Sequence, residues 1–138
     1  PPGVVFVGRL SSSDVQAEMQ KAQTLIMPSL WYEGFPMTIA EAYAAGLPVI
    51  ASHLGSMAEL VVVGQTGLLF APGEPARLVD TVRRAFANPG RLAEMGLAAR
   101  ALCESRYTAE RNLPLLEEIY RDAMAEVGRV HTATVTNQ

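Results

Sequence analysis

Short apolar runs alternate with segments of helical spacing along the first half of the chain, and this alternation limits the fold more than any other feature. Strands that are apolar on both faces and separated by helices are typical of a parallel sheet with right-handed crossovers. We therefore predict an α/β fold, a three-layer Rossmann-like parallel sheet of about four strands with helices on both faces. The predicted strands are Val4–Val7, Thr24–Met27, Val49–Ala51 and Leu68–Phe70.

Helices are predicted between these strands and throughout the C-terminal region. Pro36 suits the first turn of one helix, and Gly46 with Pro48 forms its expected stop. We expect residues 1–128 to form one domain and residues 129–138, which are polar and Thr-rich, to form a flexible tail. The predicted helices are one entered at Ser11–Asp14 and running to about Ala22, then Met37–Ala45, Ser56–Val62, Pro75–Ala87, Pro89–Ser105 and Thr108–Val127.

Composition excludes several classes of protein. The net charge is −3 with no cluster of basic residues, which argues against nucleic acid as a partner. One cysteine, Cys103, rules out a disulfide within the chain and a Cys-rich zinc site, and no other spacing resembles a metal site. No apolar run approaches the roughly 18 residues of a membrane span and no signal peptide opens the chain, so we expect a cytoplasmic protein without an integral membrane segment.

The loop before the helix that Pro36 opens is the most unusual segment. Residues 30–36 read LWYEGFP and combine large aromatic side chains with a carboxylate and a glycine. In an open parallel sheet, ligands bind beyond the carboxyl ends of the strands, where this loop is expected to lie. The N–H groups and the dipole at the helix start favour a phosphate, and Gly34 lets a ligand approach the main chain.

Two carboxylates flank this expected anion site. Glu33 directly precedes the helix, and Glu41 lies about five residues into it, roughly 7–8 Å along the axis. Carboxylates repel phosphate, so their place there makes sense if they accept hydrogen bonds from the hydroxyls of a nucleotide sugar. The alternative is that Glu33 only interacts with the helix dipole and Glu41 is solvated. In that plain interpretation, the aromatic residues Trp31, Tyr32 and Phe35 are packing residues.

Residues 28–52 carry the strongest motif, PSLWYEGFPMTIAEAYAAGLPVIAS, in which Glu33 and Glu41 are separated by seven residues. This segment resembles the signature of group 1 (family 4) glycosyltransferases, which are retaining enzymes of the GT-B fold that act without a metal. The likeness extends from about Val4 to Ala123. It includes Gly55–Glu59, Gly67–Phe70, Tyr107 and Tyr120.

The resemblance implies a role for each matched residue. Glu41 would bind the ribose hydroxyls of the donor, and Glu33 would be the catalytic carboxylate that faces the donor sugar. The donor would be a UDP-, GDP- or ADP-sugar, transferred to an acceptor hydroxyl with retention and with no cofactor. Donor-binding residues would be Gly34, Phe35, Pro36, Met37 and Thr38 through their main chain, and crevice-lining residues would be Ser52, His53 and Gly55.

The chain departs from the family pattern at two points. Proline stands at position 36, where many members have glycine, and it removes one N–H from the site. The family also has an Arg and a Lys that clamp the diphosphate, whereas here Asp14 stands five positions after Arg9. We therefore expect the clamp and an N-terminal acceptor domain to lie upstream of this chain, and the chain to be inactive alone.

Two other functions stay open. The chain could be a nucleotide- or sugar-phosphate-binding module without transferase activity, which the missing clamp favours. A receiver-like interaction domain would place Asp residues at strand ends, whereas Asp14, Asp80 and Asp122 all fall in predicted helices. For His53, the alternative to a ligand contact is an exposed loop residue.

Overall fold

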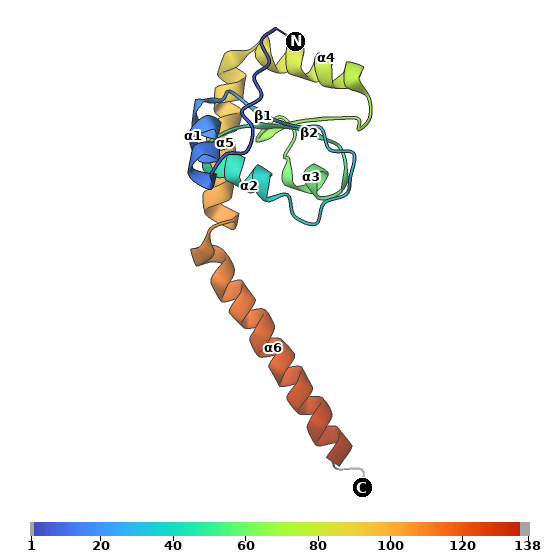
Figure 1. Cartoon of the computed structure of the whole chain (residues 1–138). Coiled ribbons are helices and arrows are strands. Elements are labelled where there is room, and N and C mark those ends of the chain that lie inside the picture. Colours follow the sequence, from blue (N-terminus) through green and yellow to red (C-terminus); the bar gives the residue numbers. More distant parts are fainter. Residues whose placement is uncertain (1, 136–138) are drawn as a thin grey trace. The chain divides into compact units, whose positions relative to one another are not determined.

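The computed structural model describes residues 2–135, with side chains described up to residue 126. The chain divides into two compact units, Pro1–Cys103 and Glu104–Gln138, which we describe separately. The helices and strands follow one another in chain order as α1, β1, α2, β2, α3, β3, α4, α5 and α6 (Figure 1).

The sheet of the first unit has three parallel strands in the order β1-β2-β3. They are β1 (Leu25–Met27), β2 (Val49–Ser52) and β3 (Gly67–Phe70). Side chains at equivalent positions of neighbouring strands lie on the same face of a sheet, and here Ile50 stands opposite both Ile26 and Leu68. Parallel strands with helices between them confirm the predicted α/β class.

The predicted first strand, Val4–Val7, is wrong. Its four side chains are between 53% and 89% exposed, and the segment is irregular. A run of apolar residues becomes a strand only where a neighbouring strand bonds its N–H and C=O groups, and no strand of residues 2–135 pairs with this one. The sheet therefore has three strands rather than the four expected.

The core lies on both faces of β2, whose four residues are all buried. Because side chains alternate along a strand, burial at consecutive positions means that both faces are covered. Ile50 and Phe70 pack with Ala85 of α4 (Pro75–Phe86) and Leu92 of α5 (Pro89–Arg106).

Two glycines allow the backbone to pack closely at the edges of this core. A Cβ on Gly67 would overlap the carbonyl oxygen of Val49, and one on Gly96 would overlap the carbonyl oxygen of Gly46. Gly46 also has a φ of 71°, which a glycine adopts easily and which ends α2 (Met37–Ala44) as predicted. Arg100 secures the same corner, because its guanidinium donates to the carbonyl oxygen of Ala44.

The remaining helices of the first unit begin close to the predicted positions. In α1 (Ser12–Lys21), the hydroxyl of Ser11 accepts from the N–H of Asp14 at 3.2 Å and caps the helix. The third helix, α3, spans Gly55–Leu60. Pro36 is the residue before α2 rather than part of its first turn, which differs from the prediction by one position.

The second unit consists chiefly of α6 (Ala109–Val135). The side-chain amide of Asn112 donates to the carbonyl oxygens of Arg106 and Thr108, each at 2.9 Å, at the start of this helix. Helical backbone thus continues to Val135, where we expected an irregular tail from residue 129; residues 136–138 lie outside the described part. The flexibility of the tail stays a prediction. No helix within the described residues is long and apolar enough to cross a membrane.

Candidate functional site

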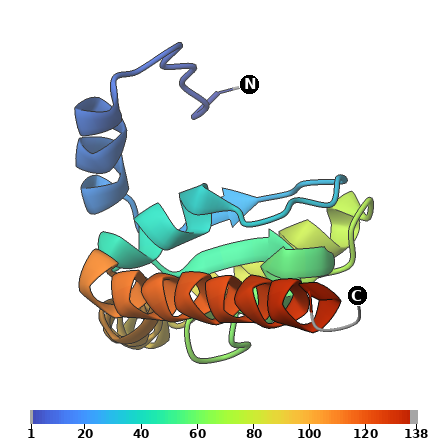
Figure 2. The same cartoon turned by 90° about the horizontal axis from the view of Figure 1, so that it is seen from below.

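The loop formed by residues 28–36 begins where β1 ends, at the carboxyl edge of the sheet. Figure 2 shows it in light blue, running out from the end of β1. Trp31 is 78% exposed and Tyr32 is 80% exposed, so neither is a core residue. The interpretation of Trp31 as a packing residue is therefore wrong, whereas the ring of Tyr32 lies over Gly55. Phe35 is 47% exposed.

The N-terminus of α2 follows this loop and has no side-chain cap. Pro36 is fully buried and accepts from the N–H of Ile39 at 2.9 Å through its carbonyl oxygen. Met37 and Thr38 are exposed residues. Within the described residues, their N–H groups make no hydrogen bond. A helix start of this kind can bind an anion through those N–H groups.

Both carboxylates of the motif are exposed and lie near this helix start. Glu33 precedes Pro36 by three residues, and Glu41 is the fifth residue of α2. On a helix, residues three and four apart share a face, so Glu41 lies on the same exposed face as Met37 and Thr38. Glu41 thus follows the unbonded N–H groups of the helix start by about one turn. Its role in ligand binding stays a prediction.

The opposite face of α2 is anchored in the core. Ile39 and Tyr43 are fully buried. The hydroxyl of Tyr43 donates to the carbonyl oxygen of Leu60 at 3.2 Å and lies 2.7 Å from the hydroxyl of Thr66. Thr66 in turn accepts from the N–H of Val62 at 3.0 Å. Because α2 is fixed to α3 and to the turn before β3, its exposed face is held in place.

The start of α3, which follows β2 in the chain, contacts the loop of residues 28–36. The hydroxyl of Ser56 donates to the carbonyl oxygen of Glu33 at 2.7 Å, and the ring of Tyr32 lies over Gly55. The sequence did not predict either contact. The partners are separated by 23 residues, and no local pattern indicates which loop residue a serine at a helix start will reach.

The three predicted crevice residues differ in their accessibility. His53 is exposed, and its N–H donates to the carbonyl oxygen of Phe70 at 2.8 Å. Ser52 is fully buried, and its hydroxyl has no hydrogen-bond partner among the described residues. Gly55 is half-buried beneath Tyr32. Their role in ligand binding stays a prediction, and for Ser52 it concerns the main chain only.

An apolar cavity of about 260 Å³ opens at the carboxyl edge, where ligands of parallel sheets bind. Leu30 of the loop and Phe70 at the end of β3 form part of it, and Glu74 lies at its edge. The sequence motif indicated the loop but not the cavity beside it. Its lining is Pro28, Leu30, Phe70, Gly73, Glu74, Pro75 and Leu78.

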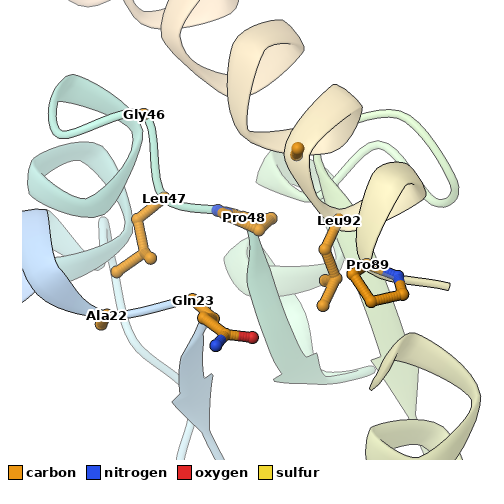
Figure 3. A pocket seen from close by; sticks show the side chains of 8 residues that line it. Ala22, Gln23, Gly46, Leu47, Pro48, Pro89 and Leu92 are labelled. Atoms are coloured by element: carbon orange, nitrogen blue, oxygen red, sulfur yellow. The ribbon is translucent and has the colours of Figure 1, made fainter. Parts of the chain in front are cut away.

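A second cavity, of about 340 Å³, lies at the amino ends of the strands. Gln23 precedes β1, and Leu47 and Pro48 precede β2, so this cavity is at the edge opposite to the motif loop. Figure 3 shows these side chains facing Pro89 and Leu92 of α5. It contains none of the predicted site residues. Across residues 2–135, no group of three or more His, Cys, Asp or Glu side chains could hold a metal ion.

Comparison with known proteins identifies the family. Residues 1–102 match the family model described as glycosyl transferases group 1. The chain therefore belongs to the group 1 glycosyltransferase family, as its motif predicted.

Two curated relatives illustrate the range of the family. A glycogen synthase from Mycobacterium tuberculosis is 37% identical over 69% of this chain and 23% of its own length. A D-inositol 3-phosphate glycosyltransferase from a Nocardioides species is 33% identical over 91% of this chain and 27% of its own length. The chain thus spans about a quarter of the length of these relatives.

Solved structures share the fold. Sucrose-phosphate synthase from Thermosynechococcus elongatus superposes with a TM-score of 0.82 and 29% identity, over 88% of this chain and 30% of that one. The Anabaena protein HepE, in complex with UDP and glucose, superposes with a TM-score of 0.78 and 26% identity, over 87% of this chain and 32% of that one. The arrangement of strands and helices described above is therefore that of GT-B glycosyltransferases.

Proposed function

We propose that this chain is the donor-binding part of a glycosyltransferase that transfers a sugar from a nucleotide diphosphate sugar to an acceptor hydroxyl with retention. The observation that carries the proposal is the start of α2. The N–H groups of Met37 and Thr38 have no hydrogen bond within the described residues, and the exposed Glu41 follows them by about one turn of the helix. The exposed Glu33 precedes them in the loop. The family match over residues 1–102 supports it.

Each group of this site has a distinct task in the proposed reaction. The helix start binds the diphosphate, which gains negative charge as its bond to the sugar breaks. Glu41 accepts hydrogen bonds from the ribose hydroxyls, and Glu33 faces the sugar close to the reacting carbon. At that carbon the bond to the diphosphate breaks and the bond to the acceptor oxygen forms, and the proton of the acceptor hydroxyl passes to the departing diphosphate. Neither carboxylate needs a metal for this role, and we propose that the reaction uses no cofactor.

The rest of the site belongs to other parts of the protein in this proposal. A diphosphate needs cationic partners as well as a helix start, and the net charge of this chain is −3. The acceptor site and the basic clamp would lie in an N-terminal domain. We therefore propose that the chain alone does not catalyse transfer.

The test uses the full-length protein that contains this chain, assayed with UDP-, GDP- and ADP-sugars. Calorimetry should show donor binding that Glu41→Ala weakens about tenfold or more, because each lost hydrogen bond to a hydroxyl leaves a partner unpaired. Glu33→Gln should retain binding and lose turnover. Glu18→Ala, an exposed glutamate of α1, is the matched control and should change neither.

Three outcomes would contradict the proposal. Unchanged donor affinity in Glu41→Ala would remove the ribose assignment. Binding without any transfer in the unmodified full-length protein would favour a non-catalytic nucleotide- or sugar-phosphate-binding module. A product of inverted anomeric configuration, determined by proton NMR, would exclude retention.

A further inference from the structure

Two adjacent residues at the start of α3 contact two adjacent residues of loop 28–36. The hydroxyl of Ser56 donates to the carbonyl oxygen of Glu33 at 2.7 Å. Beside this bond, the ring of Tyr32 covers Gly55, where an added Cβ would lie 2.9 Å from the ring carbon Cδ1. The two contacts join the loop that follows β1 to the segment that follows β2.

The bond from Ser56 restrains the main chain of Glu33, the residue whose carboxylate belongs to the proposed site. Ser29 also bonds within the loop, accepting from the N–H of Trp31 at 3.2 Å and donating to its carbonyl oxygen at 3.3 Å. Those bonds shape the loop but do not fix it to the sheet. Ser56 does so, because α3 begins only three residues after the end of the buried strand β2.

The neighbouring contact of Tyr32 adds to the restraint. Gly55 has a φ of 49°, which favours glycine, and a side chain there would push the Tyr32 ring away. The bond from Ser56 restrains the peptide unit between Glu33 and Gly34, and the contact of the Tyr32 ring with Gly55 restrains the residue before Glu33. These contacts restrain the main chain at Glu33 and therefore the direction of its Cα–Cβ bond.

We propose that Ser56 is a positioning residue for Glu33. It holds the main chain of Glu33 so that the carboxylate points to the donor sugar rather than moving with an exposed loop. The inference rests on the proposed function, in which Glu33 faces the reacting sugar while α2 and Glu41 bind the rest of the donor. Loss of the bond should therefore lower the rate of transfer more than the affinity for the donor.

The first measurement is made on the 138-residue chain itself and needs no ligand. Trp31 is the single tryptophan of the chain and lies two residues before Glu33, so its fluorescence anisotropy decay reports on motion of this loop. Ser56→Ala should enlarge the fast component of the decay, and Ser56→Thr, which keeps the hydroxyl, should restore it. Ser12→Ala, an exposed serine in the first turn of α1, is the matched control and should leave the decay unchanged.

The second measurement uses the full-length protein and the donor that supports transfer. Ser56→Ala should lower kcat about tenfold while KM for the donor changes less than about twofold, since misplacement of a reacting group costs rate. Ser56→Thr should recover most of the loss. Circular dichroism of each variant verifies that the change does not reflect unfolding.

The outcomes separate this inference from the function on which it rests. If Glu33→Gln abolishes turnover but Ser56→Ala leaves both kcat and the Trp31 decay unchanged, the positioning role is wrong and the proposed function stands. If Glu33→Gln leaves turnover unchanged, the catalytic role of Glu33 and the positioning role of Ser56 are both wrong, while the assignment of Glu41 and the helix start to donor binding is tested separately by Glu41→Ala. A loss of kcat that Ser56→Thr does not recover would show that the hydroxyl is not the cause, and it would overturn the positioning role.

Discussion

Tyr43 connects the core of the sheet to the exposed face of α2. Its side chain is fully buried, and its hydroxyl lies within hydrogen-bond distance of the carbonyl oxygen of Leu60 and the hydroxyl of Thr66. Leaving a buried polar group without a partner lowers stability by more than the net contribution of one hydrogen bond. Loss of any one of these three groups would therefore leave the others unsatisfied. The position of the helix that carries Glu41 therefore depends on a hydroxyl on the helix's opposite face.

Removing this hydroxyl should destabilise the fold. We expect Tyr43→Phe to lower the free energy of unfolding by about 1–2 kcal/mol, because the carbonyl of Leu60 and the hydroxyl of Thr66 lose a buried partner. Urea denaturation followed by circular dichroism measures the change. Tyr120→Phe, at an exposed tyrosine, should change it by less than about 0.5 kcal/mol. Equal effects of the two substitutions would show that the buried network does not stabilise the protein.

Gly67 is a residue where the close approach of two strands leaves no room for a side chain. An added Cβ would overlap the carbonyl oxygen of Val49, and because that atom is main chain the strands themselves would have to move. Gly67→Ala should lower stability by about 1–3 kcal/mol. Gly90→Ala, near the start of α5, is the control, because its Cβ would meet only the side chain of Asn88, at 3.6 Å. This substitution should leave the stability unchanged or raise it slightly. Tolerance of alanine at both positions would contradict the strand geometry.

At the scale of elements, the start of α6 has a carboxylate whose ionisation is coupled to helix formation. The pKa of Glu110 is lowered from its usual value, first by a hydrogen bond from its own backbone N–H and then by one from the side chain of Thr108. Both bonds favour the charged form at the N-terminus of a helix, where negative charge is stabilising.

The pH dependence follows from the direction of this shift. Because the pKa is lower in the folded state, the contribution of Glu110 is complete above the unfolded pKa and is lost as the pH falls through the folded value. Carbon-13 NMR of the Glu110 carboxyl should show a midpoint below the usual range for glutamate. In Thr108→Val the midpoint should rise toward that range while the bond from the backbone keeps part of the shift. A Glu110 titration midpoint at the usual value in the unmodified chain would contradict these two hydrogen bonds.

Elements with strong local signals could be predicted from the sequence. The helix of residues 75–86 has proline at its first position, and α2 ends at a glycine with positive φ, so both were found within a residue or two. Val4–Val7 has the composition of a strand and is not one, because pairing depends on a neighbour that composition does not reveal. The contact between Ser56 and Glu33 likewise joins distant residues and has no local signal.

At the scale of the whole molecule, the core described above is built from residues of the first unit. The buried side chains of the described part of the chain all lie between Met19 and Cys103. The stability of the sheet should therefore come from residues that precede α6.

A chain that ends at Arg106, the last residue of α5, should retain a cooperative unfolding transition. We expect its melting temperature to lie within about 4 °C of that of the 138-residue chain, because a difference of 1 kcal/mol shifts a domain of this size by roughly that amount. Differential scanning calorimetry of the two chains measures this. A fall of more than about 10 °C, or loss of the transition, would show that the core needs α6.

The family and the motif were predictable from residues 28–52, because the spacing of Glu33 and Glu41 is tied to the start of one helix. The arrangement of the remaining site residues was not, since exposure of Trp31 and Tyr32 and burial of Ser52 depend on how distant loops pack. The central claim is that the start of α2, and not the cavity at the opposite edge of the sheet, binds the diphosphate of a donor.

An amide NMR titration of the 138-residue chain with millimolar UDP, GDP and ADP tests this claim most directly, because shifts are detectable even for weak binding. We predict that the N–H signals of Gly34, Met37 and Thr38 move with increasing nucleotide and that those of Gln23 and Leu47 do not. Shifts at Gln23 and Leu47 without shifts at the start of α2 would contradict the account.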